Sequence, residues 1–530
     1  MHRRTFLQLS LSTVAARATV AASAADATME VALEEATLEQ LGAALRERRA
    51  SALALTRAYG ERIAAIDRMG PTLRSVIELN PDAEAIAQRL DDEARAGHWR
   101  GPLHGIPILV KDNLASADRM HTSAGSPALM GAQAPRDAFV VQRLREAGAV
   151  LLGKTNLSEW ANIRGAHSIS GWSARGGQTL NPYALDRSPS GSSSGTGAAV
   201  AANLCAAGVG TETDGSITSP SSVQALVGIK PTVGLLSRDG IVPISFTQDT
   251  PGPMCRSVRD VALLLQVMAG SDANDPATRA AGKRLQAMSL QQLDAQSLRG
   301  VRLGIASNLA GTQRDTVQLF ERAQAALKDL GAVLVDAPIP HTDKYQQTEL
   351  DLLLIELKHA MPLYLREFAA NLPHRTLADL IAYNREHAAD ELALFGQELF
   401  EQAQAKGPIS AAAYRKAFND CQRYARTLGI DAVLKSKRVS ALVAPTGDPA
   451  WLIDPINGDA VGASATSPPA VAGYPHVTVP MGQVSGGLPV GLSFIGPAWS
   501  DARLLHFAYA YEQATHHRKP PSYAAHSSRG

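Results

Sequence analysis

The sequence predicts an α/β fold: a single large domain with a mixed, mostly parallel central sheet covered by helices on both faces. Helical patterns alternate with short apolar strands over most of the chain, as expected for a sheet buried between helical layers. Hydrophobic residues make up 45% and charged residues 19% of the 530 residues, which is a globular balance. No repeat or evident linker divides the chain, so one domain with a helical elaboration is expected.

The N-terminal half supplies the first elements of this fold. Residues 32–95 have apolar side chains at three- and four-residue spacing and are predicted to be helical. A turn then leads into a short apolar strand at 106–110. A helix ends at the break at Gly148 and is followed by a buried strand at 149–153. A small-residue helix is predicted at 195–204.

The C-terminal half continues the alternation but contains one long helical interruption. Residues of about 345–435 show no strand pattern, and we expect a helical excursion that covers a cleft at the edge of the sheet. The other predicted elements are a helix at 257–270, a strand at 301–307, a helix and a strand within 316–338, and strands at 439–445, 476–482 and 488–496.

Residues 1–24 are interpreted as a twin-arginine-type export signal, which leaves 25–530 as the mature domain. Arg3 and Arg4 precede a weakly apolar run, and Ala22-Ser23-Ala24 matches an A-x-A cleavage site. The alternative is an ordinary amphipathic N-terminus. The segment is too short to span a membrane. Export by this signal implies a periplasmic or secreted protein.

Charge and cysteine content exclude several classes of partner. The 51 Lys and Arg residues balance the 50 Asp and Glu residues, so no overall field favours nucleic acid or an acidic membrane. The three widely spaced cysteines, Cys205, Cys255 and Cys421, form neither a disulfide framework nor a metal-binding cluster. No metal or nucleotide cofactor is implied, and a monomer is expected.

Two short motifs match known patterns but lie in the wrong context. Residues 148–155 fit a phosphate-binding loop, yet the intervening residues themselves look like a strand and follow a helix. Residues 191–195, "GSSSG", fit a nucleophile elbow with Ser193 as the attacking group. A Pro-broken loop precedes them instead of a strand, and the base would have to be His476, a lone histidine.

A third interpretation takes two turns and a lysine together. Three stretches together resemble the amidase signature family: "GIPILVKDN", the run "SPSGSSSGTG", and "GTETDGS", whose serine lies 24 residues after Ser192. Mapped onto that family, the lysine is Lys111, the serine of the first turn is Ser192, and the serine of the second turn is Ser216. The resemblance continues through 226–245 and 248–265 and on to 470–496, so it covers essentially the whole mature chain.

The sequence departs from the usual family pattern at three positions of the second turn. Glu212 and Asp214 replace the usual aspartate and glycine, and Thr218 stands where an arginine often occurs. A substrate that depends on that arginine is therefore not expected. We interpret Asp214 as a residue that fixes the turn through bonds from its carboxylate to nearby amides.

The resemblance implies a Ser-Ser-Lys mechanism with Ser216 as nucleophile, Ser192 as relay and Lys111 as base. A lysine is a base only when neutral, and its ordinary pKa is about 10.4. Burial disfavours the ammonium, and the apolar strand "IPILV" is expected to deliver Lys111 into the interior. The amides of Thr213, Asp214, Gly215 and Ser216 are expected to form the oxyanion hole.

Several stretches, including "LGKTNLSEWAN" and "SISGWSARGGQT", resemble the branch of the family that acts on peptide amides. The implied reaction is hydrolysis of the C-terminal carboxamide of a small peptide to the free acid and ammonia, through an acyl-enzyme. The alternatives are hydrolysis of aryl, aliphatic or fatty-acid amides, the amidase subunit of a transamidosome, a His-dependent esterase, and an inactive binding homologue.

Overall fold

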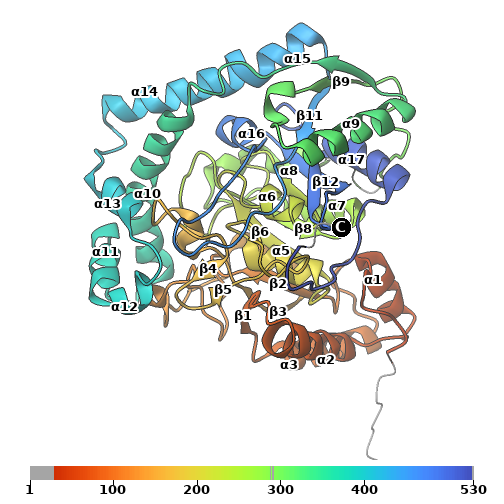
Figure 1. Cartoon of the computed structure of the whole chain (residues 1–530). Helices are drawn as coiled ribbons and strands as arrows, with labels where there is room; N and C mark the ends of the chain where they lie inside the picture. Colours follow the sequence, from red (N-terminus) through yellow and green to blue (C-terminus); the bar gives the residue numbers. More distant parts are fainter. Residues whose placement is uncertain (1–28, 287, 289, 291, 528–530) are drawn as a thin grey trace, which may run out of the picture.

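The computed structural model describes residues 29–286, 288, 290 and 292–527, so the predicted export signal at 1–24 lies outside the described residues. A sheet of 11 strands forms the centre, in the order β1-β3-β2-β6-β8-β7-β12-β13-β11-β9-β10 (Figure 1). Its strands are β1 (Val76–Leu79), β2 (Pro107–Lys111), β3 (Val150–Thr155), β6 (Ala207–Glu212), β7 (Val227–Lys230), β8 (Thr250–Cys255), β9 (Arg302–Ile305), β10 (Val333–Asp336), β11 (Ala441–Pro445), β12 (His476–Gln483) and β13 (Pro489–Ile495).

The sheet is mixed, as predicted, and its parallel pairs occur at two places. The pairs β3–β2, β2–β6, β11–β9 and β9–β10 are parallel. The other six neighbouring pairs are antiparallel, and five of them form the middle of the sheet between β6 and β11. The parallel pair β2–β6 thus lies where β2 ends at Lys111 and where β6 leads into the turn that contains Ser216.

Helices cover both faces of the sheet, which confirms the predicted fold class. Helices α5 and α6 pack on β6, β7 and β12, while α7, α9 and α17 pack on one another and on β8, β12 and β13. The helices are α1 (Leu38–Arg46), α2 (Ala52–Arg62), α3 (Ala83–Arg95), α4 (Phe139–Glu146), α5 (Ser194–Ala201), α6 (Thr218–Ser222), α7 (Val258–Met268), α8 (Ala281–Gln286), α9 (Arg314–Asp329), α10 (Gln346–Phe368), α11 (Leu377–Glu386), α12 (Ala388–Glu391), α13 (Glu398–Ala405), α14 (Ala412–Cys421), α15 (Asp431–Lys437), α16 (Ser467–Ala472) and α17 (Asp501–Thr515).

The N-terminal region is more divided than the helical prediction for 32–95. Thr37 and Ser51 cap α1 and α2 by accepting hydrogen bonds from backbone amides, which starts two separate helices. Strand β1 interrupts the helices and pairs with β3 at the sheet edge. The prediction of a largely helical region holds for α1, α2 and α3, but it missed β1 because this short, half-buried edge strand includes Glu78 and lacks a purely apolar pattern.

The region between β10 and β11 consists of α10 to α15 and a π-helix at Gln422–Ile430. In Figure 1, α10 to α13 lie together on one side of the molecule, and α14 and α15 run along its upper edge. Helix α10 packs on α11, α13 and α14 and carries Leu353 to the cavity described below. Within the described residues, no helix combines the length and apolarity needed to cross a bilayer.

A buried cation joins this helical region to the rest of the domain. Arg164 is fully buried, and its guanidinium donates to the carboxylate of Glu159, to the backbone carbonyl of Glu391 and, over 3.2 Å, to that of Phe395. Its guanidinium carbon also lies 4.2 Å from the centre of the Phe395 ring. These contacts connect α12 to the segment at 159–164. Ile163 of this segment lines the cavity described below.

Replacing Arg164 with leucine is expected to destabilise the protein by about 3–5 kcal/mol, because it leaves buried carboxyl groups without their cation. Thermal unfolding followed by circular dichroism measures the change. Arg385→Ala is the matched control, since its ion pair with Glu401 is exposed and is expected to contribute less than about 1 kcal/mol. Equal changes in the two variants would contradict the role given to Arg164.

Candidate active site

Lys111 lies at the buried end of β2, where the sequence predicted it. Every residue of β2 is buried, and the side chain of Lys111 is 0% exposed. Its Nζ lies 2.7 Å from Ser192 Oγ and 2.9 Å from Thr211 Oγ1. The apolar strand therefore delivers an amine into the protein interior and points it at the first serine of the predicted site.

The surroundings of Lys111 favour its neutral form. Burial lowers the pKa of Lys111 to about 7, because an ammonium loses its hydration in the interior. The carboxyl groups of Asp249 and Glu212 act in the opposite direction and raise this pKa. Burial dominates, so a substantial share of the amine is neutral near neutral pH.

The first turn leads into α5 and holds Ser192 two residues before the start of that helix. The peptide bond between Gly191 and Ser192 is cis. Space at Gly191 is so limited that a Cβ atom there would lie 2.2 Å from Ser158 Oγ. The backbone carbonyl of Ser192 accepts a hydrogen bond of 3.1 Å from the amide of Ser158. The Ser/Gly-rich run is thus a tight, buried turn, as its composition suggested.

The second turn leaves β6 and holds Ser216 beside the first. The amide of Ser193 donates to the carbonyl of Ser216 over 3.1 Å, which joins the two turns directly. Gly215 has a φ of +77°, a left-handed conformation that glycine adopts without a steric penalty. In the part of the chain that the structure describes, the amides of Asp214, Gly215 and Ser216 donate to no protein acceptor. Donors of this kind are available to an oxyanion.

The carboxylate that fixes the second turn is that of Glu212 and not that of Asp214. Glu212 Oε2 accepts hydrogen bonds from the amides of Ile217 and Thr218 over 2.8 and 2.9 Å. Asp214 instead accepts a hydrogen bond of 2.6 Å from the hydroxyl of Ser467. The expectation for Asp214 was wrong because the following α6 turns its free amides toward position 212.

A cavity of about 340 Å³ opens in front of Ser216. The predicted oxyanion residues Thr213, Asp214 and Gly215 line it together with Ser216, whose exposed fraction is 9%. The remaining lining is mainly small polar and apolar and comes from the segments at 161–163, 190–191 and 451–467 and from single residues elsewhere. Neither Lys111 nor Ser192 is among the residues that line the cavity.

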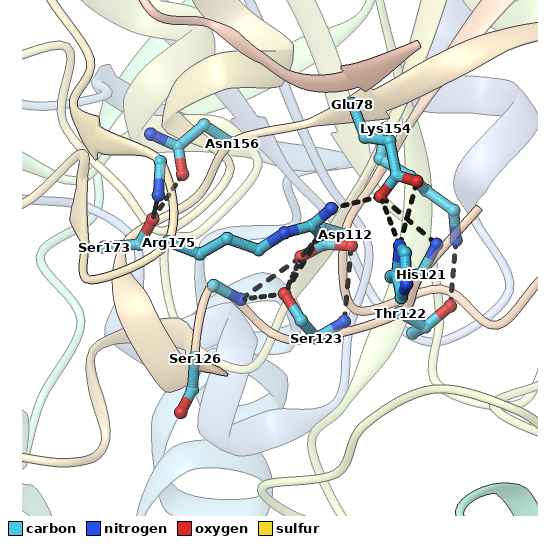
Figure 2. Close-up of polar contacts among 12 residues, drawn as sticks. Glu78, Asp112, His121, Thr122, Ser123, Ser126, Lys154, Asn156, Ser173 and Arg175 are labelled. Atoms are coloured by element: carbon cyan, nitrogen blue, oxygen red, sulfur yellow. Dashed lines mark hydrogen bonds and ion pairs between the residues drawn. The ribbon is translucent and has the colours of Figure 1, made fainter. Parts of the chain in front are cut away.

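A buried polar network holds the chain just after Lys111. Figure 2 shows Asp112 between Ser123 and Arg175, and Arg175 reaching on to Glu78. Asp112 accepts hydrogen bonds of 3.3 Å from the amide of Ser123 and from Arg175 Nη1. These contacts fix the chain directly after the end of β2.

The two short motifs that lie in the wrong sequence context, at 148–155 and 191–195, do not form a phosphate-binding loop or a nucleophile elbow. Lys154, in the apparent phosphate loop, is a buried residue of β3 and donates to Thr122 Oγ1 over 3.0 Å (Figure 2). Ser193 is buried, and its hydroxyl donates to the carbonyl of Thr211 over 3.1 Å. His476 Nε2 lies 2.6 Å from Ser493 Oγ, and burial lowers the pKa of His476 to about 3. Among the described residues, neither the hydroxyl of Ser193 nor the ring of His476 is hydrogen-bonded to the hydroxyl of Ser216.

Metal and disulfide chemistry find no support in the described residues. No group of three or more His, Cys, Asp or Glu side chains in the described ranges is arranged to hold a metal ion. Cys205, Cys255 and Cys421 are buried free thiols.

Two polar residues near the site were not anticipated from the sequence. Thr211 accepts from Lys111 and also accepts a hydrogen bond of 2.9 Å from Asn113 Nδ2. Ser467 contacts Asp214 from a segment about 250 residues away in the chain. Thr211 lies within the run "GTETDGS", next to Glu212. Because side chains alternate along a strand, the sequence indicates that Thr211 and Glu212 face opposite sides of it. No feature of the sequence around Ser467 indicates its contact with Asp214.

The comparison with protein families identifies the class of protein that this fold and site define. The family model described as Amidase matches residues 54–505. The chain therefore belongs to the amidase signature family and is a hydrolase that acts on amide C–N bonds.

Individual relatives agree over nearly the whole chain. The peptide amidase of Stenotrophomonas maltophilia is 50% identical, with a TM-score of 0.86 over 92% of this chain and 99% of that chain. A structure of peptide amidase with the competitive inhibitor chymostatin is 51% identical, with a TM-score of 0.88 over 92% and 99% of the two chains. A probable amidase of Arabidopsis thaliana is 40% identical over 93% of this chain and 92% of its own length.

Proposed function

We propose that the protein is a serine amidase that hydrolyses the C-terminal carboxamide of small peptides through a Ser-Ser-Lys triad. The observation that carries the proposal is the buried hydrogen bond of 2.7 Å between Lys111 Nζ and Ser192 Oγ. It gives a neutral amine a hydroxyl partner in a turn that is bonded to the turn of Ser216. A hydroxyl both donates and accepts, so Ser192 can relay a proton.

In the proposed acylation step, Ser216 Oγ attacks the carboxamide carbon as its proton passes to Ser192, whose own proton passes to Lys111. The carbonyl oxygen becomes an oxyanion and accepts hydrogen bonds from the turn amides at 213–216. The C–N bond then breaks, and a proton returns to the leaving nitrogen, so that ammonia departs and Ser216 carries the acyl group. Water attacks this ester by the same route and releases the free acid.

The substrate class is supported by the relatives and by the cavity. Two structures of peptide amidase match this chain, at 51% and 50% identity. A cavity of about 340 Å³ is within the usual range for small-molecule sites and matches a short peptide terminus. We also propose, from Arg3 and Arg4, the weakly apolar run after them and the A-x-A site at 22–24, that the enzyme is exported. We further propose that it acts as a monomer without nucleic acid, membrane or cofactor.

A panel of amides separates this proposal from its alternatives. The panel contains N-acylated dipeptide amides, a simple aliphatic amide, an anilide and a fatty-acid amide, each followed by ammonia or amine release. Preference for the dipeptide amides by at least about tenfold in kcat/KM supports the proposed substrate class. Preference for any other member reassigns the substrate and leaves the triad in place.

Replacing Ser216 with alanine is expected to lower kcat for ammonia release by a factor of about a million, because the nucleophile is lost. Covalent labelling by a fluorophosphonate probe, read by intact-protein mass spectrometry, should disappear as well.

Ser193→Ala is the matched control, since it removes a neighbouring hydroxyl that bonds only Thr211. This variant should keep labelling and most activity. A Ser216→Ala enzyme that still turns over, or a Ser193→Ala enzyme that loses labelling, would refute the assignment.

The pH dependence of kcat/KM reports the protonation of Lys111. The base acts when neutral, and burial lowers the pKa of Lys111 to about 7. Activity should therefore rise with pH up to that value and level off above it, falling about tenfold for each pH unit below. Lys111→Met should lose nearly all activity, and His476→Gln should keep the wild-type profile. A profile governed by a group that titrates near pH 10, or by His476, would contradict the proposed base.

A further inference from the structure

The cavity in front of Ser216 has an uneven distribution of charge. Two carboxylates, Asp214 and Asp459, line it, and no lysine, arginine or histidine among the described residues does so. The other side chains around it are small and polar, or apolar, such as Ile244, Leu353 and Val461. The cavity therefore presents negative charge without a cation in its lining.

Asp459 is held in a structural contact. Its Oδ2 accepts a hydrogen bond of 2.6 Å from Ser170 Oγ, and its Oδ1 accepts one of 3.0 Å from Trp451 Nε1. The amide of Ser170 lies 3.1 Å from both oxygens. These donors offset the charge of Asp459 and tie the segment at 451–459 to the segment around Ser170.

Asp214 is less completely partnered and lies nearer to the chemistry. It is two residues from Ser216, and its only hydrogen-bonded oxygen is Oδ2, which accepts from Ser467. Its Oδ1 is buried and has no hydrogen-bond partner. A carboxylate oxygen without a donor keeps more of its charge available to act on a ligand in the cavity.

A second buried carboxyl group, that of Glu349, interacts with the carboxyl group of Asp214, and the two form a pair in which one member is favoured to carry the charge. Glu349 of α10 is nearly buried and accepts a hydrogen bond of 2.8 Å from Gln248 Nε2. Burial and the carboxylate of Asp214 raise the pKa of Glu349 well above its usual range. Burial also raises the pKa of Asp214, while hydrogen bonds from Ser467 and Thr466 and the ammonium of Lys230 lower it. The pKa is raised further at Glu349 than at Asp214, so the charged form of the pair is favoured on Asp214.

We propose that the carboxylate of Asp214 is a specificity-determining group that selects against negative charge on the terminal residue of the substrate. The proposal rests on the function proposed above. A peptide amide whose terminal residue is acidic brings a second carboxylate into a poorly screened cavity beside Asp214. At a separation of roughly 8 Å and an effective dielectric constant of about 20, such a repulsion lowers binding by more than about tenfold.

The same repulsion acts on the product. Hydrolysis replaces the neutral carboxamide by a carboxylate next to Ser216, two residues from Asp214 along the turn. The free acid should therefore bind more weakly than the amide from which it was formed. Substrates with neutral or cationic terminal residues are the class that the cavity accepts.

A matched pair of substrates tests the proposal. Two N-acetylated dipeptide amides differ only in their terminal residue, which is aspartate in one and the nearly isosteric asparagine in the other. Hydrolysis at either amide of the asparagine substrate gives products of the same mass, so chromatography against synthetic standards of both products identifies which amide is hydrolysed. The wild-type enzyme should prefer the asparagine substrate by at least about tenfold in kcat/KM, and Asp214→Asn should reduce this ratio to below about threefold.

Two further variants isolate the charge. Ser467→Ala removes the hydroxyl bonded to Asp214 but keeps the carboxylate, so the preference should persist. Asp459→Asn removes the other carboxylate and should lower the ratio less than Asp214→Asn does. If Asp214→Asn proves inactive, calorimetric binding of both amides to Ser216→Ala and to the double variant with Asp214→Asn measures the same discrimination without turnover.

A wild-type ratio near one overturns the proposal. So does a ratio that survives Asp214→Asn, or one that collapses only in Asp459→Asn. Failure of the wild-type enzyme to hydrolyse the asparagine substrate or any other peptide amide is a different result, because it refutes the proposed function itself.

Discussion

An amine enclosed by protein loses the hydration that stabilises its proton, and the arrangement around Lys111 follows from this constraint. The fully buried strand β2 carries the residue inward, and burial lowers the pKa of Lys111 to about 7. A surface lysine would be charged and unable to accept a proton at neutral pH. Ser192 and Thr211 give the amine its hydrogen-bond partners, so the cost of burying a polar group is partly offset.

The rest of the site keeps two turns in fixed positions relative to that amine. A backbone hydrogen bond between Ser193 and Ser216 joins the two turns, and Glu212 holds the second turn against α6. The parallel strands β2 and β6 are neighbours in the sheet, which places Lys111 beside the start of the second turn. The helical region contributes Leu353 to the cavity, while Arg164 ties that region to the segment at 159–164. The fold thus brings together groups from distant parts of the chain.

Much of this could be predicted from the sequence. The alternation of helices and apolar strands predicted the mixed sheet, and the resemblance to the amidase signature family placed Lys111 next to Ser192. Edge strand β1 was missed because a short strand that includes Glu78 has no clear apolar alternation. The contact between Asp214 and Ser467 could not be predicted, since it joins residues that only the complete fold brings together. The same holds for the effect of Asp214 on the pKa of Glu349, which depends on how α10 packs.

The protonation of Lys111 can be observed directly, without reference to turnover. Titration of the protein with isotope-labelled lysine by nuclear magnetic resonance, with Lys111→Met used to assign the signal, follows this one amine through pH. The account predicts a midpoint at about 7 for this signal. A Lys111 signal that remains that of an ammonium until a pH of about 10.4, the ordinary value for lysine, would contradict it.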